Sequence, residues 1–208
     1  MAGLDSGDVA GACWGCPICR SGNHRVKYDL REKHSWFAVA GWILRCEDCG
    51  MWYKALEEGE VLEDAYGEEY SEHFGEDECM MNDVIRIFFR DVLKRIDGNG
   101  LSDSPLLLDI GAATGVFMEE AVKLGYEAEG LELSQGFVDI ARRNGMNVRH
   151  QNVSDLNEVE KYDVITMMDI VEHVVDPVGI LKTLCTSLKP GGKLVLFTPN
   201  HGSSVVAA

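Results

Sequence analysis

The sequence predicts an α/β protein, a doubly wound parallel sheet preceded by a small zinc ribbon. Two observations carry this prediction. From Leu106 onward, short apolar runs that suit buried strands alternate with segments of helical period. Nearer the N-terminus, two Cys-x-x-Cys pairs frame a short segment. A chain of 208 residues can hold two modest domains. We expect a zinc ribbon at 1–55, an acidic linker at 56–79 and the α/β domain at 80–208.

The paired cysteines predict a metal site. Cys16 and Cys19 form one pair, Cys46 and Cys49 form the other, and 26 residues separate them. Four thiolates are the soft, tetrahedral ligand set that Zn²⁺ prefers. Because four protein ligands leave no open position for a substrate, the expected zinc is structural. A redox role is the weaker alternative, since neither pair follows a strand and begins a helix.

Cys13 leaves one question open within this segment. Its spacing to Cys16 equals that of a metal-binding pair, so Cys13 is an alternative ligand. We prefer Cys16 and Cys19 because Pro17 suits the tight turn between them and because this pair mirrors the second one. Strands are expected at Val26–Leu30 and Trp36–Ala40, with Trp42–Arg45 leading into the second pair.

Charge is distributed unevenly along the chain. The formal net charge is −16, and eleven acids with no Lys or Arg lie between Glu57 and Glu78. Such a block disfavours nucleic acid and anionic membrane as partners, and we interpret it as a solvated linker. No apolar run approaches the roughly 20 residues of a membrane span, and the N-terminus lacks the features of a signal peptide. We therefore expect a cytoplasmic protein, in which seven cysteines indicate metal binding rather than disulfides.

The α/β domain is expected to begin with a helix over Met80–Ile96, where apolar residues recur at helical spacing. A strand follows at Leu106–Leu108 and ends at the acid Asp109. The next residues form the small-residue loop Gly111–Gly115, which opens a helix over Val116–Leu124. Small side chains let a ligand approach the loop backbone and the helix N-terminus.

This loop reads D-I-G-A-A-T-G, whereas dinucleotide-binding loops read G-x-G-x-x-G. An acid beside the loop would repel a phosphate, but it can accept hydrogen bonds from an ammonium group or from water. For the loop alone, an ordinary tight turn between strand and helix remains an equal alternative.

The later elements continue the alternation of strands and helices. A second strand at Tyr126–Leu131 ends at Glu132, 23 residues after Asp109, where nucleotide-binding folds place an acid against ribose hydroxyls. The remaining expected elements are a helix at Gln135–Arg143, strands at Asn147–Asn152 and Tyr162–Met167, a helix at Pro177–Leu188 with Cys185 in its buried face, and a strand at Lys193–Phe197.

Four segments together resemble the class I S-adenosylmethionine-dependent methyltransferases, in particular the ubiquinone-biosynthesis-like and sugar methyltransferase branch. They are D-I-G-A-A-T-G (109–115), G-L-E-L-S (130–134), Y-D-V-I-T-M-M-D-I-V-E-H-V (162–174) and L-K-P-G-G-K-L-V-L-F-T-P-N (188–200). One such segment would be weak evidence, but four in this order and spacing are specific. The resemblance covers Leu106 to Asn200 and implies a Rossmann-like fold.

The resemblance also implies a cofactor site. The methionine end of S-adenosylmethionine would lie on Asp109, Gly111, Ala112, Ala113 and Gly115. Glu132 would bind the ribose. Leu133, Val153 and Asp155 would border the adenine, and the backbone around Met168 would close the floor of the site.

His173 is the candidate catalytic residue. It follows the strand at Tyr162–Met167, in a loop that faces cofactor and acceptor in the family. A histidine there is a candidate general base because its pKa lies near working pH. The alternative is that His173 only orients the loop by hydrogen bonding, and a base is needed only when the acceptor is a hydroxyl or a carbon acid.

The acceptor is expected to be a small molecule, such as a sugar nucleotide, a quinone precursor or another metabolite. An RNA base methyltransferase and a non-catalytic S-adenosylmethionine-binding protein are the alternatives. The family usually continues with two more antiparallel strands and an acceptor-covering region after the strand at Lys193–Phe197. Their absence leaves three interpretations: the chain is shortened, it forms a homodimer that completes the sheet at its open edge, or it has lost activity.

Overall fold

The computed structural model describes residues 15–29, 42–55, 83–96, 101 and 103–199. The chain divides into two compact units, residues 1–65 with 175–178 and residues 66–174 with 179–208. Each unit is described separately below. No helix in the described ranges is both long enough and apolar enough to cross a membrane.

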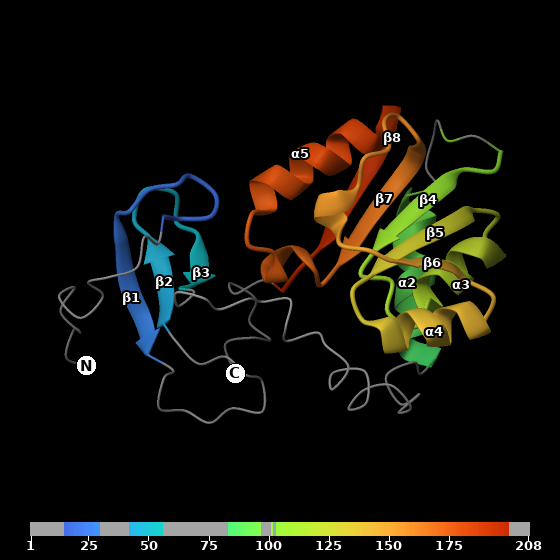
Figure 1. Cartoon of the computed structure of the whole chain (residues 1–208), viewed down its shortest axis with the longest axis horizontal. Helices are drawn as coiled ribbons and strands as arrows, with labels where there is room; N and C mark the ends of the chain where they lie inside the picture. The colour runs from blue at the N-terminus through green and yellow to red at the C-terminus, as the bar shows by residue number, and fades with distance from the viewer. Residues whose placement is uncertain (1–14, 30–41, 56–82, 97–100, 102, 200–208) are drawn as a thin grey trace. The chain divides into compact units, whose positions relative to one another are not determined.

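The small unit contains a three-stranded antiparallel sheet in the order β1-β2-β3 (Figure 1). The strands are β1 (His24–Asp29), β2 (Trp42–Cys46) and β3 (Trp52–Lys54). The strand expected at Trp36–Ala40 lies outside the described residues, and β3 was not expected. On β2, Leu44 and Cys46 are buried, so one face of this sheet is turned inward beside the cysteine pairs.

The large unit contains a five-stranded sheet whose order is β6-β5-β4-β7-β8, and all four pairings are parallel. The strands are β4 (Leu106–Ile110), β5 (Glu127–Glu132), β6 (Asn147–His150), β7 (Tyr162–Met168) and β8 (Leu188–Phe197). The first strand of the sheet, β4, therefore lies at its centre, and the chain proceeds outward first to one side and then to the other. This reversal is the point where open parallel sheets bind ligands, at the carboxyl ends of the strands.

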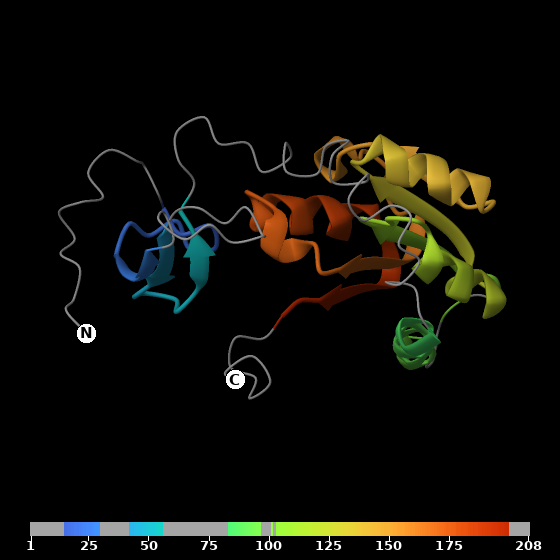
Figure 2. The ribbon, with the colours of Figure 1, turned by 90° about the horizontal axis from the view of Figure 1, so that it is seen from below.

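Helices cover both faces of the sheet. The helices are α2 (Asp83–Ile96), α3 (Val116–Lys123), α4 (Gln135–Arg143) and α5 (Pro177–Ser187). Residues of α2, α3 and α4 pack on one face, and Leu184 of α5 packs on the other. In the view of Figure 2, β7 and β8 lie between α5 and α2. The doubly wound α/β prediction is thus confirmed.

Two strand boundaries and the burial of one cysteine differ from what was expected. The third strand of the sheet ends at His150, because the side chain of Asn152 accepts the N–H of Ser154 and starts the short 3-10 turn η4 (Val153–Asp155). The last strand begins at Leu188, which pairs with Tyr162. The prediction of a buried Cys185 was wrong, because this side chain is exposed on α5.

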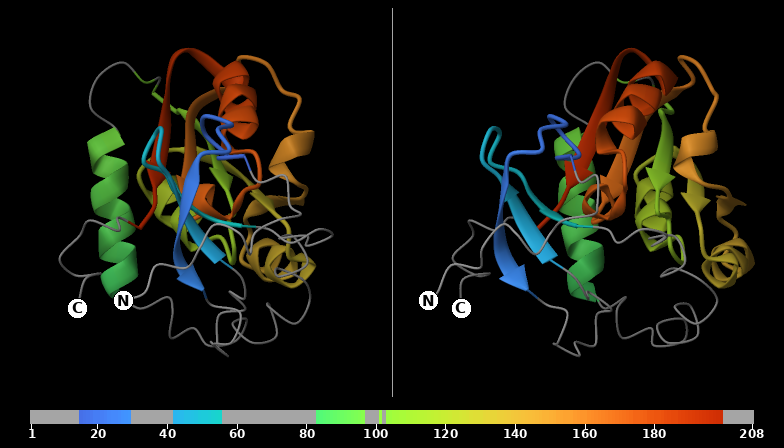
Figure 3. Two further views of the ribbon diagram at one scale, coloured as in Figure 1. Left: turned by 90° about the vertical axis from the view of Figure 1, so that its left-hand side faces the viewer. Right: turned by 60° about the vertical axis from the view of Figure 1, so that its left-hand side comes forward.

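Ion pairs and an aromatic contact hold α2 against the rest of the unit. Glu120 of α3 is only 2% exposed, and it forms ion pairs with Arg86 and Arg90 of α2 at 2.8 and 3.2 Å. At the other end of the sheet, the rings of Phe88 and Phe197 stand 5.1 Å apart. Both views of Figure 3 show α2 alongside β8. This strand is the last one in the described part of the sheet.

Candidate functional site

The loop after β4 has a backbone that requires glycine. Gly111 and Gly115 have φ of +75° and +86°, in the left-handed region that favours glycine. A Cβ at Gly111 would lie 2.2 Å from Cδ1 of Ile170, so Ile170 would have to move to admit a side chain there. The N–H groups of Gly111 and Ala112 both donate to the carbonyl of Leu131, which fixes the loop to the end of β5.

Asp109 is a buried acid at the base of this loop. It is 3% exposed, and Thr166 Oγ1 of β7 donates a hydrogen bond to its Oδ1 at 2.7 Å. Burial raises the pKa of Asp109 to about 7, and the negative charge of Glu132 adds to the effect. An acid that titrates near neutral pH can take or give a proton, which an ordinary aspartate cannot do at that pH.

Glu132, at the end of β5, joins the two neighbouring loops. Its Oε2 accepts the N–H of Ala113 at 2.9 Å, and its Oε1 accepts those of Leu133 and Ser134 at 2.7 and 2.8 Å. A carboxylate has about four acceptor positions, so about one remains for a ligand. The structure therefore gives Glu132 a role in loop architecture that the sequence did not suggest, beside its predicted role at the ribose.

The other predicted cofactor residues also follow strand ends. Leu133 is 37% exposed beside Glu132, Asp155 is exposed in η4, and Met168 is half-buried at the end of β7. Val153, also in η4, is 8% exposed and packs into the core beside Leu131. The structure thus places all of these residues at the carboxyl edge of one sheet, and their contacts with a cofactor remain predictions.

Two buried hydroxyl groups near this edge lack partners among the described residues. They are Oγ of Ser134, at the N-cap of α4, and Oγ1 of Thr114, in the first loop. Unpaired buried hydroxyl groups are costly, so their position beside the small-residue loop fits a region built to receive a polar ligand. The residues present therefore fit S-adenosylmethionine, which offers a diol, an amine and a carboxylate.

The predicted base His173 is exposed in the 3-10 turn η5 (Val171–His173). Ile170 lies just before it and reaches Gly111, so this turn adjoins the first loop. Asp169 precedes the turn with a left-handed φ of +54°. Desolvation and then Glu172 raise the pKa of Asp169, while His173 lowers it. Asp169 and His173 thus interact electrostatically.

Sequence reasoning missed several of these residues. Thr166 could have been recognised from the sequence, because it is the single hydroxyl-bearing residue in the apolar run V-I-T-M-M. Ser134 and Asp169 carry no comparable signal, since their significance comes from burial and from backbone conformation.

The four predicted cysteines converge in the small unit. The Sγ atoms of Cys16, Cys19, Cys46 and Cys49 all lie within 4.8 Å of one another, and two of the pairs are 3.5 Å apart. A tetrahedron with zinc–sulfur bonds of about 2.3 Å has edges of about 3.8 Å, so the set fits zinc. Cys13 lies outside the described residues.

The two cysteine pairs adopt the same turn. In each, the N–H of the first cysteine donates to the carbonyl five residues later, in Ser21 and Met51, at 2.8 Å. The carbonyl of the same cysteine accepts the N–H four residues later, from Arg20 and Gly50 respectively. Both of those residues have positive φ, +63° and +80°. Such paired turns direct four sulfur atoms to one point.

Comparison with known proteins agrees with this architecture. Residues 84–206 match the protein family described as "Methyltransferase domain". A ubiquinone biosynthesis O-methyltransferase of Xanthomonas oryzae pv. oryzae is 34% identical over 109 residues, which are 49% of this chain and 46% of that protein. An enzyme of the same name from Coxiella burnetii is 32% identical over 102 residues, 46% of this chain and 44% of that one. The chain spans about half the length of these relatives.

Solved structures show the same fold. A Methanococcus maripaludis protein described as an S-adenosyl-L-methionine-dependent methyltransferase superposes with a TM-score of 0.55 at 17% identity, over 68% of this chain and 66% of that one. A SAM-dependent methyltransferase of Thermotoga maritima superposes with a TM-score of 0.53 at 23% identity, over 67% of this chain and 63% of that one. At these identities the likeness concerns the fold alone.

Proposed function

The chain belongs to the methyltransferase domain family, and from this premise we propose that it transfers the methyl group of S-adenosylmethionine to a small-molecule acceptor. The observation that carries the proposal is the Glu132 carboxylate, which is held by Ala113 of the first loop and by the turn after β5. In this arrangement the carboxylate lies beside a glycine loop and a buried acid, where it would accept hydrogen bonds from ribose hydroxyls. These three features together suit a nucleoside with a charged amino-acid end.

The proposed contacts follow the strand ends. Glu132 would bind the ribose, and the first loop would hold the methionine end. The adenine would lie along Leu133 and η4, and backbone at Met168 would close the floor. The residues proposed for the methionine end are Asp109, Gly111, Ala112, Ala113 and Gly115. When bound, S-adenosylmethionine supplies an electrophilic methyl group on a sulfonium.

The protein's own contribution to catalysis would be mainly alignment. Holding an acceptor in line with the transferable group converts an encounter in solution into a reaction within one complex. For a hydroxyl acceptor, His173 would take the proton from the acceptor oxygen. If the acceptor needs no base, His173 would only orient the turn after β7.

The acceptor is proposed to be a small hydroxyl-bearing metabolite. This choice is supported by the names of the relatives, which act in ubiquinone biosynthesis, and by the net charge of −16, which disfavours nucleic acid. Quinone precursors and sugar nucleotides are both in this class.

Two alternatives make different predictions. An RNA base methyltransferase would methylate RNA in preference to metabolites. A non-catalytic binding protein would bind the cofactor and form no product. Calorimetry with S-adenosylmethionine, followed by assays for S-adenosylhomocysteine with phenols, sugar nucleotides and total RNA, separates the three. Absence of binding would contradict the proposal and the non-catalytic alternative alike.

We also propose that Cys16, Cys19, Cys46 and Cys49 hold one structural zinc ion, in a separate ribbon domain at 1–55 joined by the linker at 56–79 to the domain at 80–208. This is supported by the convergence of their sulfur atoms. The ion would stabilise the small sheet and would leave no coordination position for a substrate. The cytoplasmic location stays a prediction.

A homodimer through β8, the outermost strand in the part of the sheet that the structure describes, is a further proposal. It is supported by the exposure of Leu196 and Phe197 on β8, 42% and 41%, and of Ile87 on the neighbouring helix, 59%. Apolar edge strands tend to pair with a second chain. Light scattering across a concentration series should show a dimer that Leu196→Glu weakens, and a wild-type protein that stays monomeric at every concentration would contradict it.

A further inference from the structure

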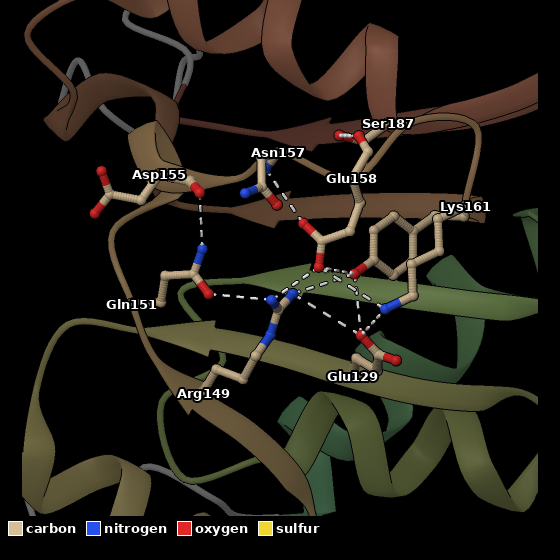
Figure 4. Close-up of polar contacts among 9 residues, drawn as sticks. Glu129, Arg149, Gln151, Asp155, Asn157, Glu158, Lys161 and Ser187 are labelled. Carbon is tan, nitrogen blue, oxygen red and sulfur yellow. Dashed lines mark hydrogen bonds and ion pairs between the residues drawn. The ribbon is translucent and has the colours of Figure 1, made fainter.

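A polar cluster occupies the face of the sheet opposite α3 and α4. Because side chains alternate along a strand, Glu129 of β5 and Arg149 of β6 point away from the face on which Val148 packs. Arg149 Nη1 forms an ion pair with Glu158 Oε1 at 2.8 Å, and Lys161 Nζ forms one with Glu129 Oε2 at 2.8 Å (Figure 4). The hydroxyl of Tyr162 donates to Glu129 Oε2 at 3.0 Å and joins the two pairs.

Gln151 connects this cluster to the proposed cofactor edge. Its Oε1 accepts a hydrogen bond from Arg149 Nη1 at 3.1 Å, and its Nε2 donates one to the carbonyl of Asp155 at 3.1 Å (Figure 4). Because arginine only donates and a carbonyl only accepts, the orientation of the Gln151 amide is fixed. The backbone N–H of Gln151 also donates to the carbonyl of Glu132.

The segment held by Gln151 is the turn η4. Asn152 begins it by accepting the N–H of Ser154 at 2.9 Å, and the N–H of Asp155 donates back to the carbonyl of Asn152. Val153 anchors the turn in the core, whereas Asp155 is exposed. The exposed end of the turn thus depends on the side chain of Gln151 for a hydrogen bond from the sheet.

We propose that Arg149 and Gln151 are positioning residues for the adenine end of the cofactor, acting through the turn Val153–Asp155. Arg149 sets the amide orientation of Gln151, and Gln151 holds the Asp155 carbonyl. The backbone of the turn is thereby kept near the carboxyl ends of β5 and β6. This inference rests on the proposed function, because it concerns the same cofactor edge.

The cluster itself offers a matched control. Lys161 Nζ pairs with Glu129 Oε2 at 2.8 Å and approaches Glu158 Oε1 only to 3.8 Å, so its ion pairs are with these two acids and not with Gln151 or η4. Removing Lys161 therefore disturbs the same network without touching the link to the turn. A purely structural cluster would respond alike to the loss of Arg149, Gln151 or Lys161.

The experiment compares full-length wild type with Gln151→Met, Gln151→Glu, Arg149→Met and Lys161→Met. Affinity for S-adenosylhomocysteine and for methylthioadenosine is measured by calorimetry, and the melting temperature is measured without ligand. Gln151→Met removes both side-chain hydrogen bonds. Gln151→Glu keeps the contact with Arg149 but cannot donate to the Asp155 carbonyl.

Both Gln151 variants should raise the Kd of both ligands about five- to tenfold, the scale of one lost hydrogen bond. Both ligands carry adenine, so the factor should be the same for each. Arg149→Met should raise Kd similarly and also lower the melting temperature, whereas Lys161→Met should lower only the melting temperature.

Unchanged Kd values in the two Gln151 variants would overturn the inference, as would an equal loss of affinity in Lys161→Met. A wild type that binds neither ligand would overturn the cofactor assignment first and this inference with it. A wild type that binds both, with variants that do not differ from it, would overturn the inference alone.

Discussion

The backbone N–H of Ala113 donates a hydrogen bond to Glu132 Oε2 at 2.9 Å, so the loop after β4 and the end of β5 are locked to each other. This contact makes Glu132 both a structural residue and a proposed ligand-binding residue. Glu132→Ala should weaken S-adenosylmethionine binding by roughly 1.5–3 kcal/mol, the scale of hydrogen bonds to a charged group. It should also loosen the loop. Calorimetry measures the affinity, and hydrogen exchange at Ala113 measures the loosening.

The matched control is Glu127→Ala, which removes an exposed carboxylate at the other end of β5. It should leave both measurements near wild type. If Glu132→Ala binds the ligand as tightly as wild type does, the ribose is not held by this carboxylate.

Gly111 combines a left-handed backbone with close contact to Ile170. Gly111→Ala should lower the free energy of unfolding by about 1–3 kcal/mol, because the new Cβ overpacks the loop. Gly111→Val should abolish S-adenosylmethionine binding. Gly125 separates the effect of backbone strain from the effect of overpacking. Its φ is +92°, but a Cβ there meets nothing within 4 Å. Gly125→Ala should cost about 1 kcal/mol from backbone strain alone and leave binding intact.

Adding Ile170→Ala to Gly111→Val should restore part of the lost binding if the clash with Ile170 is the cause. Chemical denaturation and calorimetry test all of these variants. Equal stability losses at Gly111 and Gly125, with no effect on binding, would mean that Ile170 yields to the added methyl group.

Asp109 should make stability depend on pH. Burial raises the pKa of this carboxyl from 3.8 to about 7 in the folded protein. The folded protein therefore keeps a proton that the unfolded chain releases near pH 4. The contribution of Asp109 to the free energy of unfolding is then fully present below that pH, and it is lost as the pH rises through about 7.

Asp109→Asn replaces the carboxyl with a neutral amide, which can still accept the hydrogen bond from Thr166. Compared with wild type, this variant should gain relative stability between about pH 4 and about pH 7, measured by urea unfolding. Asp139→Asn, an exposed change on α4, serves as the control. Parallel pH curves for wild type and Asp109→Asn would contradict the buried, titrating acid.

The sequence was sufficient to predict features that depend on local order. The strand before Asp109, the small-residue loop and the acid at Glu132 follow one another along the chain, so their placement at one sheet edge follows from the alternation of strands and helices. The Thr166–Asp109 hydrogen bond joins residues 57 positions apart, and it depends on the register of β4 with β7. Neither that register nor the burial that shifts the pKa of Asp109 is encoded in any single segment.

In the cysteine site, too, the local sequence predicts some features and the three-dimensional fold determines others. Spacing, with Pro17 in the first pair deciding against Cys13, predicted Cys16, Cys19, Cys46 and Cys49 as ligands, and the structure brings these four together. The sequence did not predict that Arg20 and Gly50 occupy the same position in the two turns, because an arginine with a left-handed backbone has no sequence signature. The link from Arg149 through Gln151 to η4 was also hidden, since it passes through side chains on two strands and a loop.

The zinc site gives the last prediction. Protein purified without added metal should contain about one zinc per chain, because four thiolates form a closed tetrahedral set. Cys46→Ser combined with Cys49→Ser should lose the zinc. The double variant should also make the small sheet sensitive to trypsin at Arg25 and Arg45, which lie on β1 and β2. The reason is that the four sulfur atoms, which lie within 4.8 Å of one another, lose the ion that would hold them together. Cys185→Ser, an exposed cysteine on α5, is the control and should retain both zinc and protease resistance. Elemental analysis and limited proteolysis measure the two effects, and a double variant that keeps a full equivalent of zinc would show that other residues bind it.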